Sequence, residues 1–321
     1  MSFDAEINRL RSICSQSLLP LIGPKCILAD APYYDNIGDI LIWQGIHDFL
    51  KDNSRKCLHD YSMWTFDYPA LPPDVTILLT GGGNFGDLWR VFQDFRLNII
   101  GNYPDNPVVM FPQSVWYDDK NLLAKDAGAM AQHKNLTLCA RDRYTYDIFR
   151  THFSSNNIML IPDMAFCISE NHLSPYRNQS VKGRSLYFKR TDKELCNSTV
   201  IFNDQFSDIR DWPSMEHKMA RFELFRIARG IRRRLPGRHL RHICGNAIDL
   251  IARPAIRTAM LNTGCRFLAP YEHVTTTRLH AMILSILLHK PVSYIDNTTG
   301  KLSAFAQTWL SDLDAINPYQ K

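Results

Sequence analysis

Short apolar runs alternate along the chain with longer segments in which apolar residues recur at helical spacing. Five runs in the first half have the length and composition of buried strands: residues 25–31, 75–80, 107–111, 136–140 and 158–161. After the first run, one face of a helix carries Ile42, Trp43, Ile46, Phe49 and Leu50. This alternation predicts a parallel β-sheet covered on both faces by helices, the arrangement of the α/β class.

The second half repeats the alternation after a polar stretch at residues 169–183, which contains Pro and Gly and predicts a linker. Four further strands are expected: residues 184–189, 199–202, 265–269 and 291–295. We therefore predict two Rossmann-like domains that face each other across a cleft, residues 1–175 and residues 176–321.

Composition narrows the class of protein. The 321 residues are comfortable for two domains, and 45% apolar with 21% charged residues is typical of a soluble globular protein. A net charge of +5 is too small to imply a strong nucleic-acid binder. The N-terminal segment is too charged for a signal peptide, and the longest apolar run, residues 281–288, is too short to span a bilayer. Eight cysteines without close pairs argue against a disulfide framework or a zinc site, so a cytoplasmic location is expected.

The segment Thr-Thr-Thr-Arg-Leu-His at residues 275–280 precedes an apolar helix whose buried face carries Leu279, Met282, Ile283, Ile286 and Leu287. We expect the threonines to cap this helix, and Arg278 and His280 to lie in its first turn, where the helix dipole attracts anions. A fixed positive charge beside a titratable imidazole suits a phosphorylated or carboxylated substrate that needs a proton moved. The alternative is a polar helix start that is merely solvated.

Polar residues at the strand ends are further candidates, because ligands bind beyond the carboxyl ends of parallel strands. These ends carry Asn36, Asp39, Gly82, Gly83, Asn84, Asp87, Ser114, Arg141 and Asp163. The glycines at 81, 83 and 86 match a dinucleotide motif, but no acidic residue ends a following strand at the expected distance. A turn that a ligand can approach closely is the better interpretation. For Asp39 and Asp87, ordinary helix capping stays an alternative.

Taken in order, these motifs resemble the polysaccharide pyruvyl transferase family across most of the chain. The resemblance rests on Asn-Ile-Gly-Asp at 36–39, Gly-Gly-Gly-Asn at 81–84, Arg-Asp at 141–142, Pro-Asp at 162–163, Lys-Arg-Thr-Asp at 189–192, Arg-Leu-His-Ala at 278–281, Lys-Pro-Val at 290–292, Asp-Asn at 296–297 and Gly-Lys at 300–301. Each motif is unspecific alone, but their order and spacing together are specific. The family resembles the two-domain GT-B glycosyltransferases in fold.

The resemblance implies transfer of pyruvate from phosphoenolpyruvate onto two hydroxyls of a sugar in a bacterial polysaccharide precursor, which forms a cyclic ketal. It places Arg190, Arg278, Leu279 and His280 at the phosphoenolpyruvate site. Lys189 and Lys301 are further candidates for the same charge, since two arginines and a lysine suit a ligand with both phosphate and carboxylate.

His280 is the best-placed residue to move a proton, and Arg278 completes the expected catalytic pair. The acceptor side is expected to hold Asn36, Asp39, Gly82, Gly83, Asn84, Asp87 and Asp163. Which of these acids assists His280 stays open. No metal and no cofactor beyond the co-substrate phosphoenolpyruvate is expected.

Residues 218–241 form a basic segment, with nine lysines and arginines against one glutamate and with apolar residues at roughly helical spacing. We expect a basic helix over 215–241 that lies on an anionic membrane surface, which would place the protein on the inner face of the plasma membrane. A polyprenyl-diphosphate-linked acceptor would fit that location. The alternative is a helix packed on its own domain, and nucleic acid is disfavoured because no recognition fold accompanies the segment.

Two other classes of function stay open, because fold does not determine function. A nucleotide-sugar glycosyltransferase of the same shape would need an acidic pair for the ribose, for which Glu272 alone is available. A non-catalytic anion- or glycan-binding protein would be favoured if His280 were buried away from any cleft.

Overall fold

The computed structural model describes residues 1–190, 206–296 and 300–319, which form two parallel β-sheets surrounded by helices. The first sheet contains β1 (Lys25–Leu28), β2 (Lys56–Asp60), β3 (Thr76–Leu79), β4 (Gly82–Gly86), β5 (Val108–Trp116), β6 (Leu136–Ala140) and β7 (Asn157–Leu160). Its order is β2-β1-β3-β5-β6-β7, with β4 paired beside β5. The five strands expected in this half are confirmed.

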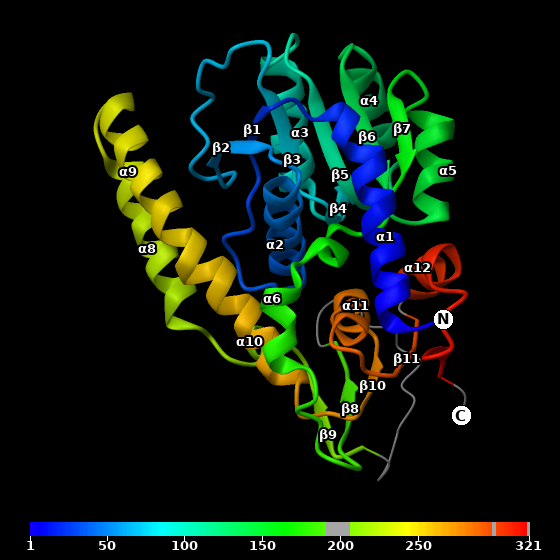
Figure 1. Cartoon of the computed structure of the whole chain (residues 1–321). Helices are drawn as coiled ribbons and strands as arrows, with labels where there is room; N and C mark the ends of the chain where they lie inside the picture. Colours follow the sequence, from blue (N-terminus) through cyan, green and yellow to red (C-terminus); the bar gives the residue numbers. More distant parts are fainter. Residues whose placement is uncertain (191–205, 297–299, 320–321) are drawn as a thin grey trace.

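The second sheet contains β8 (Ser185–Phe188), β9 (Asp208–Arg210), β10 (His273–Thr276), β11 (Val292–Tyr294) and β12 (Ile316–Pro318). Its order is β12-β11-β10-β8-β9, and every pairing between described strands of either sheet is parallel. Figure 1 shows the first sheet in the upper part of the molecule and the second sheet in the lower part. The predicted α/β class with parallel sheets is therefore confirmed.

Helices cover both sheets. The longer ones are α1 (Phe3–Leu18), α2 (Ile37–Asp52), α3 (Arg90–Asn102), α4 (Lys120–Ala131), α5 (Arg143–His152), α8 (Ala220–Arg234), α9 (Arg238–Ala252), α10 (Ala259–Leu268), α11 (Leu279–Leu287) and α12 (Lys301–Trp309). Shorter helical turns are η1 (Leu19–Leu21), η2 (Met164–Cys167), α6 (Glu170–Leu173), η3 (Ser174–Tyr176), α7 (Pro213–Glu216) and η4 (Arg253–Thr258). Among the described residues, no helix is both long enough and apolar enough to cross a bilayer.

The side chains of the first sheet point alternately to its two faces, and this divides the hydrophobic core into two clusters. Leu28 and Leu78 point into a cluster that also contains the apolar faces of α2 and α11 and reaches the second sheet at Leu186. Their neighbours Ile27 and Ile77 point into a second cluster on the opposite face, packed against α3 and α5. Because successive side chains of a strand face opposite sides, these fully buried strands read as continuous apolar runs.

The expectation for residues 265–269 is wrong. They belong to the end of α10, whose buried face includes Met260, Leu261, Cys265 and Leu268 at helical spacing. The strand begins later, at His273, and takes up two of the threonines that we expected to cap the next helix. Arg278 occupies the N-cap position of α11 instead, without a side-chain cap. A short apolar run fits helix or strand equally well, and β-branched threonine favours a strand.

The expected single basic helix is divided in two. α8 ends at Arg234, and α9 begins at Arg238 after Pro236 and Gly237. Proline lacks the N–H that a continuing helix needs, and Gly237 has a φ of 75°, which glycine adopts without strain. The predicted linker at 169–183 is also partly helical, since it contains α6 and η3. The expected strand at 199–202 and the motif residues 191–192 and 297 lie outside the described residues.

Candidate active site

A cavity of about 540 Å³ lies where several strands of both sheets end. Its polar lining comes from the loop after β1, from β4, and from the residues that follow β6, β8 and β10. The volume is in the range of about 300–1,000 Å³ that is usual for small-molecule sites. The position agrees with the rule that ligands bind beyond the carboxyl ends of parallel strands.

Four helices begin at this cavity. The N-cap residues Asn36 of α2, Trp89 of α3 and Arg278 of α11 line it, as does Lys301, the first residue of α12. The positive dipole ends of these helices therefore lie around one space, while some of their first N–H groups are already bonded, that of Gly38 to Asn36 and those of Leu302 and Ser303 to Asp296. Such an arrangement favours an anionic ligand before any side-chain charge is counted.

Most of the residues expected at the site lie together in this lining: Asn36, Asp39, Gly83, Asn84, Arg190, Arg278, Leu279, His280 and Lys301. Gly82 and Asp163 lie directly behind it. Lys189 is not part of the lining; its backbone N–H donates to the carbonyl of Arg210. Asp87 also lies outside the lining of the cavity. Its carboxylate accepts from the backbone N–H groups of Asp118 and Asp119, each at 2.8 Å, and holds that turn in place.

His280 lies in the first turn of α11, where its ring packs on the backbone of Gly38. A Cβ at position 38 would lie 2.4 Å from His280 Nδ1, so only glycine leaves room for the imidazole. The other ring nitrogen, Nε2, lies 3.4 Å from Asp163 Oδ2. That contact has ion-pair distance without hydrogen-bond geometry, and Nε2 is a buried nitrogen with no hydrogen-bond partner among the described residues. The side chain is 12% exposed, toward the cavity.

Asp163 is fully buried behind His280 and is held by Arg141. Arg141 Nη1 donates to Asp163 Oδ2 at 2.9 Å, and Nε donates to Ser114 Oγ at 2.8 Å. Burial alone would raise the pKa of Asp163, but His280 and Arg141 outweigh it and lower the pKa to about 2. Asp163 is therefore a permanent negative charge beside the imidazole.

Asp39 has the opposite character. Its Oδ2 accepts from Tyr34 Oη and from Asn36 Nδ2, both at 2.9 Å, while Gly82 packs near Oδ1. Burial raises the pKa of Asp39 above its ordinary value, although His280 and Tyr34 counteract the shift. A carboxyl with a raised pKa beside an imidazole is an arrangement able to exchange protons with a ligand.

Four cationic side chains line the cavity: Arg141, Arg190, Arg278 and Lys301. Two of them flank Gly83, since a Cβ there would lie 3.3 Å from Arg141 Nη2 and 3.4 Å from Lys301 Nζ. Arg190 is held through its backbone, which donates to Thr277 Oγ1 at 2.9 Å. Sequence analysis recognised Arg141 as a strand-end residue but did not include it in the site.

The guanidinium of Arg278 is oriented by an acid that sequence analysis missed. Nε and Nη2 donate to the two oxygens of Asp211 at 2.5 and 2.7 Å, and both side chains are buried. Asp211 directly follows β9, a strand that the sequence pattern did not predict, so its place at a strand end could not be recognised in advance. The bidentate pair makes Arg278 a rigid part of the cavity wall.

Aromatic residues form the apolar side of the cavity: Tyr34, Trp64, Trp89, Phe92 and Trp212. Tyr34 and Phe92 meet edge to face with ring centroids 5.5 Å apart. They come from loops and helix starts, where no periodic pattern pointed to them. A lining that combines aromatic rings with cationic side chains suits a ligand with both an anionic part and an apolar face.

One group of possible metal ligands occurs among the described residues, His47, Cys57 and Asp60, and it does not line the cavity. His47 Nε2 already lies 2.7 Å from Asp60 Oδ2. Arg253 and Arg257 each approach the same oxygen at 3.5 Å. Two guanidinium groups beside the carboxylate supply its positive charge, so the donor set does not fit a metal ion well.

The chain is similar in sequence to known proteins. The chain is 32% identical to the candidate pyruvyl transferase EpsO of Bacillus subtilis over 92% of this chain and 88% of that protein. It is 29% identical to Pyruvyl transferase 1 of Schizosaccharomyces pombe over 89% of this chain and 70% of that one.

The fold is similar to that of an uncharacterized protein from Klebsiella pneumoniae, with a TM-score of 0.63, 19% identity, and coverage of 97% and 99% of the two chains. Residues 36–299 match the polysaccharide pyruvyl transferase family as a whole. This chain belongs to the polysaccharide pyruvyl transferase family.

Proposed function

We propose that the protein transfers pyruvate from phosphoenolpyruvate onto two hydroxyls of one sugar and forms a cyclic ketal. The observation that carries this proposal is the cavity itself, where four cationic side chains and four helix starts surround two titratable groups, Asp39 and His280. Phosphoenolpyruvate combines a phosphate and a carboxylate on a small frame, so it needs several positive groups at different angles. Arg190, Lys301 and Arg141 supply these charges, together with Arg278 as fixed by Asp211.

The reaction needs one proton delivered to carbon and protons removed from hydroxyls. In our mechanism His280 donates a proton to the methylene carbon, which becomes the methyl group, and buried Asp163 stabilises the imidazolium. Asp39 accepts the proton of the first sugar hydroxyl as its oxygen bonds to the central carbon. The bond from that carbon to the phosphate oxygen then breaks, and the phosphate leaves with the electron pair. The second hydroxyl bonds to the same carbon, and its proton leaves with the released hydrogen phosphate.

We further propose that residues 1–175 and 176–321 act as two Rossmann-like domains of the GT-B type, with the acceptor on the first side and phosphoenolpyruvate on the second. Asn36, Asp39, Gly83 and Asn84 belong to the first sequence half, while Arg190, Arg278 and Lys301 belong to the second. No resident metal or cofactor enters this mechanism, because side chains supply every charge and proton that it uses.

A lipid-linked acceptor at a membrane surface also fits the hairpin of α8 and α9, which extends along one side of the molecule (Figure 1). The hairpin exposes large apolar side chains: Leu224, Ile227, Ile231, Leu240, Ile243, Leu250 and Ile251. Arginines surround them, as expected for an element that lies on an anionic bilayer. We propose that this face rests on the inner side of the plasma membrane, close to a polyprenyl-diphosphate-linked acceptor.

The decisive experiment incubates the purified protein with phosphoenolpyruvate and a panel of sugar acceptors, with and without a chelator. We expect acceptor-dependent phosphate release, a ketal detectable by mass spectrometry, and no loss of rate with the chelator. Consumption of a nucleotide sugar without phosphoenolpyruvate turnover would favour a glycosyltransferase instead. The geometry speaks against that alternative, since Glu272 is not part of the cavity lining and accepts from the backbone N–H of Gly183 at 2.7 Å.

A further inference from the structure

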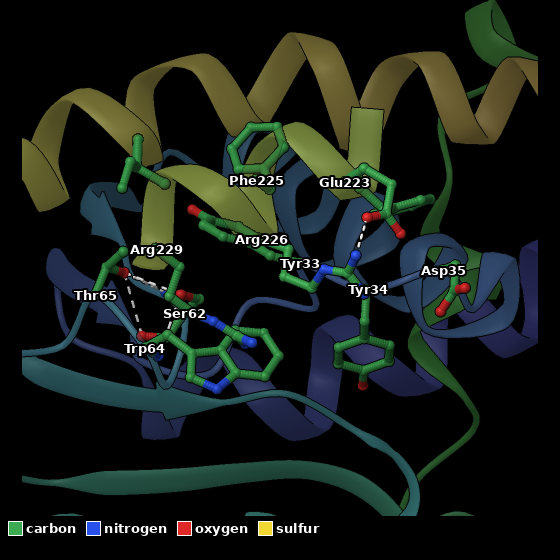
Figure 2. A pocket seen from close by; sticks show the side chains of 12 residues that line it. Tyr33, Tyr34, Asp35, Ser62, Trp64, Thr65, Glu223, Phe225, Arg226 and Arg229 are labelled. Carbon is green, nitrogen blue, oxygen red and sulfur yellow. Dashed lines mark hydrogen bonds and ion pairs between the residues drawn. The ribbon is translucent and has the colours of Figure 1, made fainter. Parts of the chain in front are cut away.

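A second cavity, of about 210 Å³, lies between α8 and the two loops that follow β1 and β2 (Figure 2). Its wall is rich in rings, with Tyr33, Tyr34 and Trp64 on the loops and Phe222 and Phe225 on α8. At ~30 Å³ per water molecule it has the volume of about seven waters, which is room for a single pyranose ring. A ligand larger than one sugar ring would have to extend beyond this cavity.

The wall of this second cavity is built from buried hydrogen bonds. Tyr33 Oη and Thr65 Oγ1 both donate to Asp249 Oδ1, at 3.0 and 2.8 Å, and Asp249 is buried in α9. Ser62 Oγ lies 3.1 Å from Thr65 Oγ1. These contacts hold the two loops and α9 together, so the cavity keeps its shape without a ligand.

Charge in the second cavity is balanced. Arg226 is paired with Glu223 on the same helix, as Figure 2 shows. The guanidinium of Arg229 lies over the ring of Trp64, 4.4 Å from its centroid. Asp35 adds the remaining carboxylate of the lining. Two arginines against two carboxylates do not select an anion, whereas aromatic faces with polar groups at their edges suit a neutral ligand that has one apolar face and many hydroxyls.

The second cavity adjoins the main one, because Tyr34, Asp35 and Trp64 line both. The rings of Tyr34 and Trp64 meet edge to face with centroids 6.4 Å apart. The hydroxyl of the same Tyr34 donates to Asp39 in the main cavity. A ligand that fills both spaces would therefore contact the residue that orients Asp39.

We propose that the second cavity binds the sugar unit next to the one that receives pyruvate, so that the acceptor is an oligosaccharide of at least two sugars. This inference rests on the proposed function, which supplies the reacting sugar in the main cavity. Trp64 and the rings of α8 contact the apolar face of the second sugar, and Asp35 and Glu223 bond to its hydroxyls. Binding energy from this remote sugar helps to place the reacting sugar beside Asp39.

The test compares initial rates for a monosaccharide glycoside and a disaccharide glycoside that end in the same reacting sugar. The wild-type protein should have the higher kcat/KM with the disaccharide. Phe222→Ala should raise KM for the disaccharide by roughly 2- to 10-fold, the value of one aromatic contact, and leave KM for the monosaccharide unchanged, because Phe222 lines the second cavity and not the main one. Tyr144→Ala is the matched control, because Tyr144 is an exposed ring on α5 that lines neither cavity.

Several outcomes separate this inference from the proposed function. If neither acceptor supports phosphate release, the proposed function fails. If both turn over equally well in the wild-type protein, the inference fails, whether or not Phe222→Ala folds. Inhibition of the wild-type protein by inorganic pyrophosphate, competitive with acceptor and abolished by Arg229→Ala, would assign the second cavity to a diphosphate and overturn the inference. Phe222→Tyr keeps a ring and should retain most of the preference for the disaccharide.

Discussion

Asp39 and Asp163 both interact with His280, and their surroundings shift the pKa values of the two carboxyls in opposite directions. Asp163 has a pKa of about 2 because His280 and Arg141 outweigh the effect of burial. Asp39 has a raised pKa because burial outweighs its partners. Two carboxyls with divergent pKa values beside one imidazole are typical of sites that divide acid, base and charge-stabilising roles. For this reason our proposed mechanism uses Asp39, rather than Asp163 or Asp87, as the base for the acceptor hydroxyl.

Replacing His280 with alanine removes the proposed proton donor. Loss of a positioned acid–base group typically costs about 10²- to 10⁴-fold, so kcat for phosphate release should fall by that amount. The affinity for phosphoenolpyruvate should change far less, because the arginines and Lys301 carry the opposing charge. Assays of phosphate release check kcat, and binding measurements in parallel check the affinity for phosphoenolpyruvate. A wild-type kcat in His280→Ala would remove His280 from the mechanism.

Gly38 offers a test of the imidazole position without touching the imidazole. In Gly38→Ala the added methyl would lie 2.4 Å from His280 Nδ1, so the ring must move. A displacement of about 1 Å in a catalytic group costs roughly 10²-fold, and we expect a loss of that order in kcat. Gly128→Ala on α4 is the control, since nothing lies within 4 Å of a Cβ there and alanine favours the helix. Equal activity in the two variants would contradict the packing described for His280.

Arg278→Lys should be almost as damaging as Arg278→Ala, because one ammonium cannot replace a fork bonded to both oxygens of Asp211. Breaking a buried pair by removal of one partner costs about 3–5 kcal/mol of the free energy of unfolding. The free energy of unfolding, measured with urea, and the rate of turnover should therefore both fall in the two variants. A fully active, fully stable Arg278→Lys would show that the Asp211 pair has no structural role.

At the scale of helices, the hairpin of α8 and α9 buries one of the arginines that the sequence pattern places among exposed basic residues. Arg232 is not a surface charge. Its side chain is 7% exposed, forms an ion pair with Asp67, and donates to the carbonyl of Trp64 at 2.8 Å. Reversal of Arg232, Arg233 and Arg234 together, the change that the basic segment suggests, would break this buried contact and destabilise the hairpin. The triple reversal therefore would not separate an effect on membrane binding from an effect on folding.

A sharper test reverses only charges on the exposed side. Arg233→Glu with Arg234→Glu should weaken sedimentation with anionic vesicles by several kcal/mol, since each basic residue near such a surface contributes on the order of 1 kcal/mol. Ile227→Ser should weaken it further through lost apolar contact. Activity on a short soluble acceptor should be retained. Lys125→Glu with Arg150→Glu on α4 and α5 is the matched control, and equal binding by both double variants would remove the membrane from the proposed function.

At the scale of the whole molecule, the contacts of buried Asp163 with Arg141 and His280 make the free energy of unfolding depend on pH. The folded-state pKa of Asp163, about 2, is below the unfolded value of 3.8, so the folded state binds fewer protons in that interval. Its contribution is therefore fully present above about pH 4 and is lost as the pH falls toward 2, with a size on the order of 2 kcal/mol. Urea unfolding across this interval should show the loss in the wild-type protein. Asp163→Asn should lack it, and parallel curves for the two proteins would contradict the assignment.

The sequence by itself determined the parallel α/β class and about half of the cavity lining. Fully buried strands appear as apolar runs, and the carboxyl ends of parallel strands converge by topology, so Asp39 and Asn84 could be placed at one edge of the sheet from local pattern. The resemblance of the motifs to a known family added Arg190 and His280 to the same site. The helix at Leu279–Leu287 was equally evident, because its buried face repeats at helical spacing.

Only the tertiary structure decided which partners these residues have. Asp211 behind Arg278, Asp163 behind His280, and Asp67 beside Arg232 are contacts between segments that are far apart in the sequence. The second cavity likewise depends on α8 packing across two loops from the other half of the chain. Local periodicity records which face of an element is buried, but not what it is buried against. Pairing, pKa and cavity shape all depend on that second property, and so only the folded chain determines them.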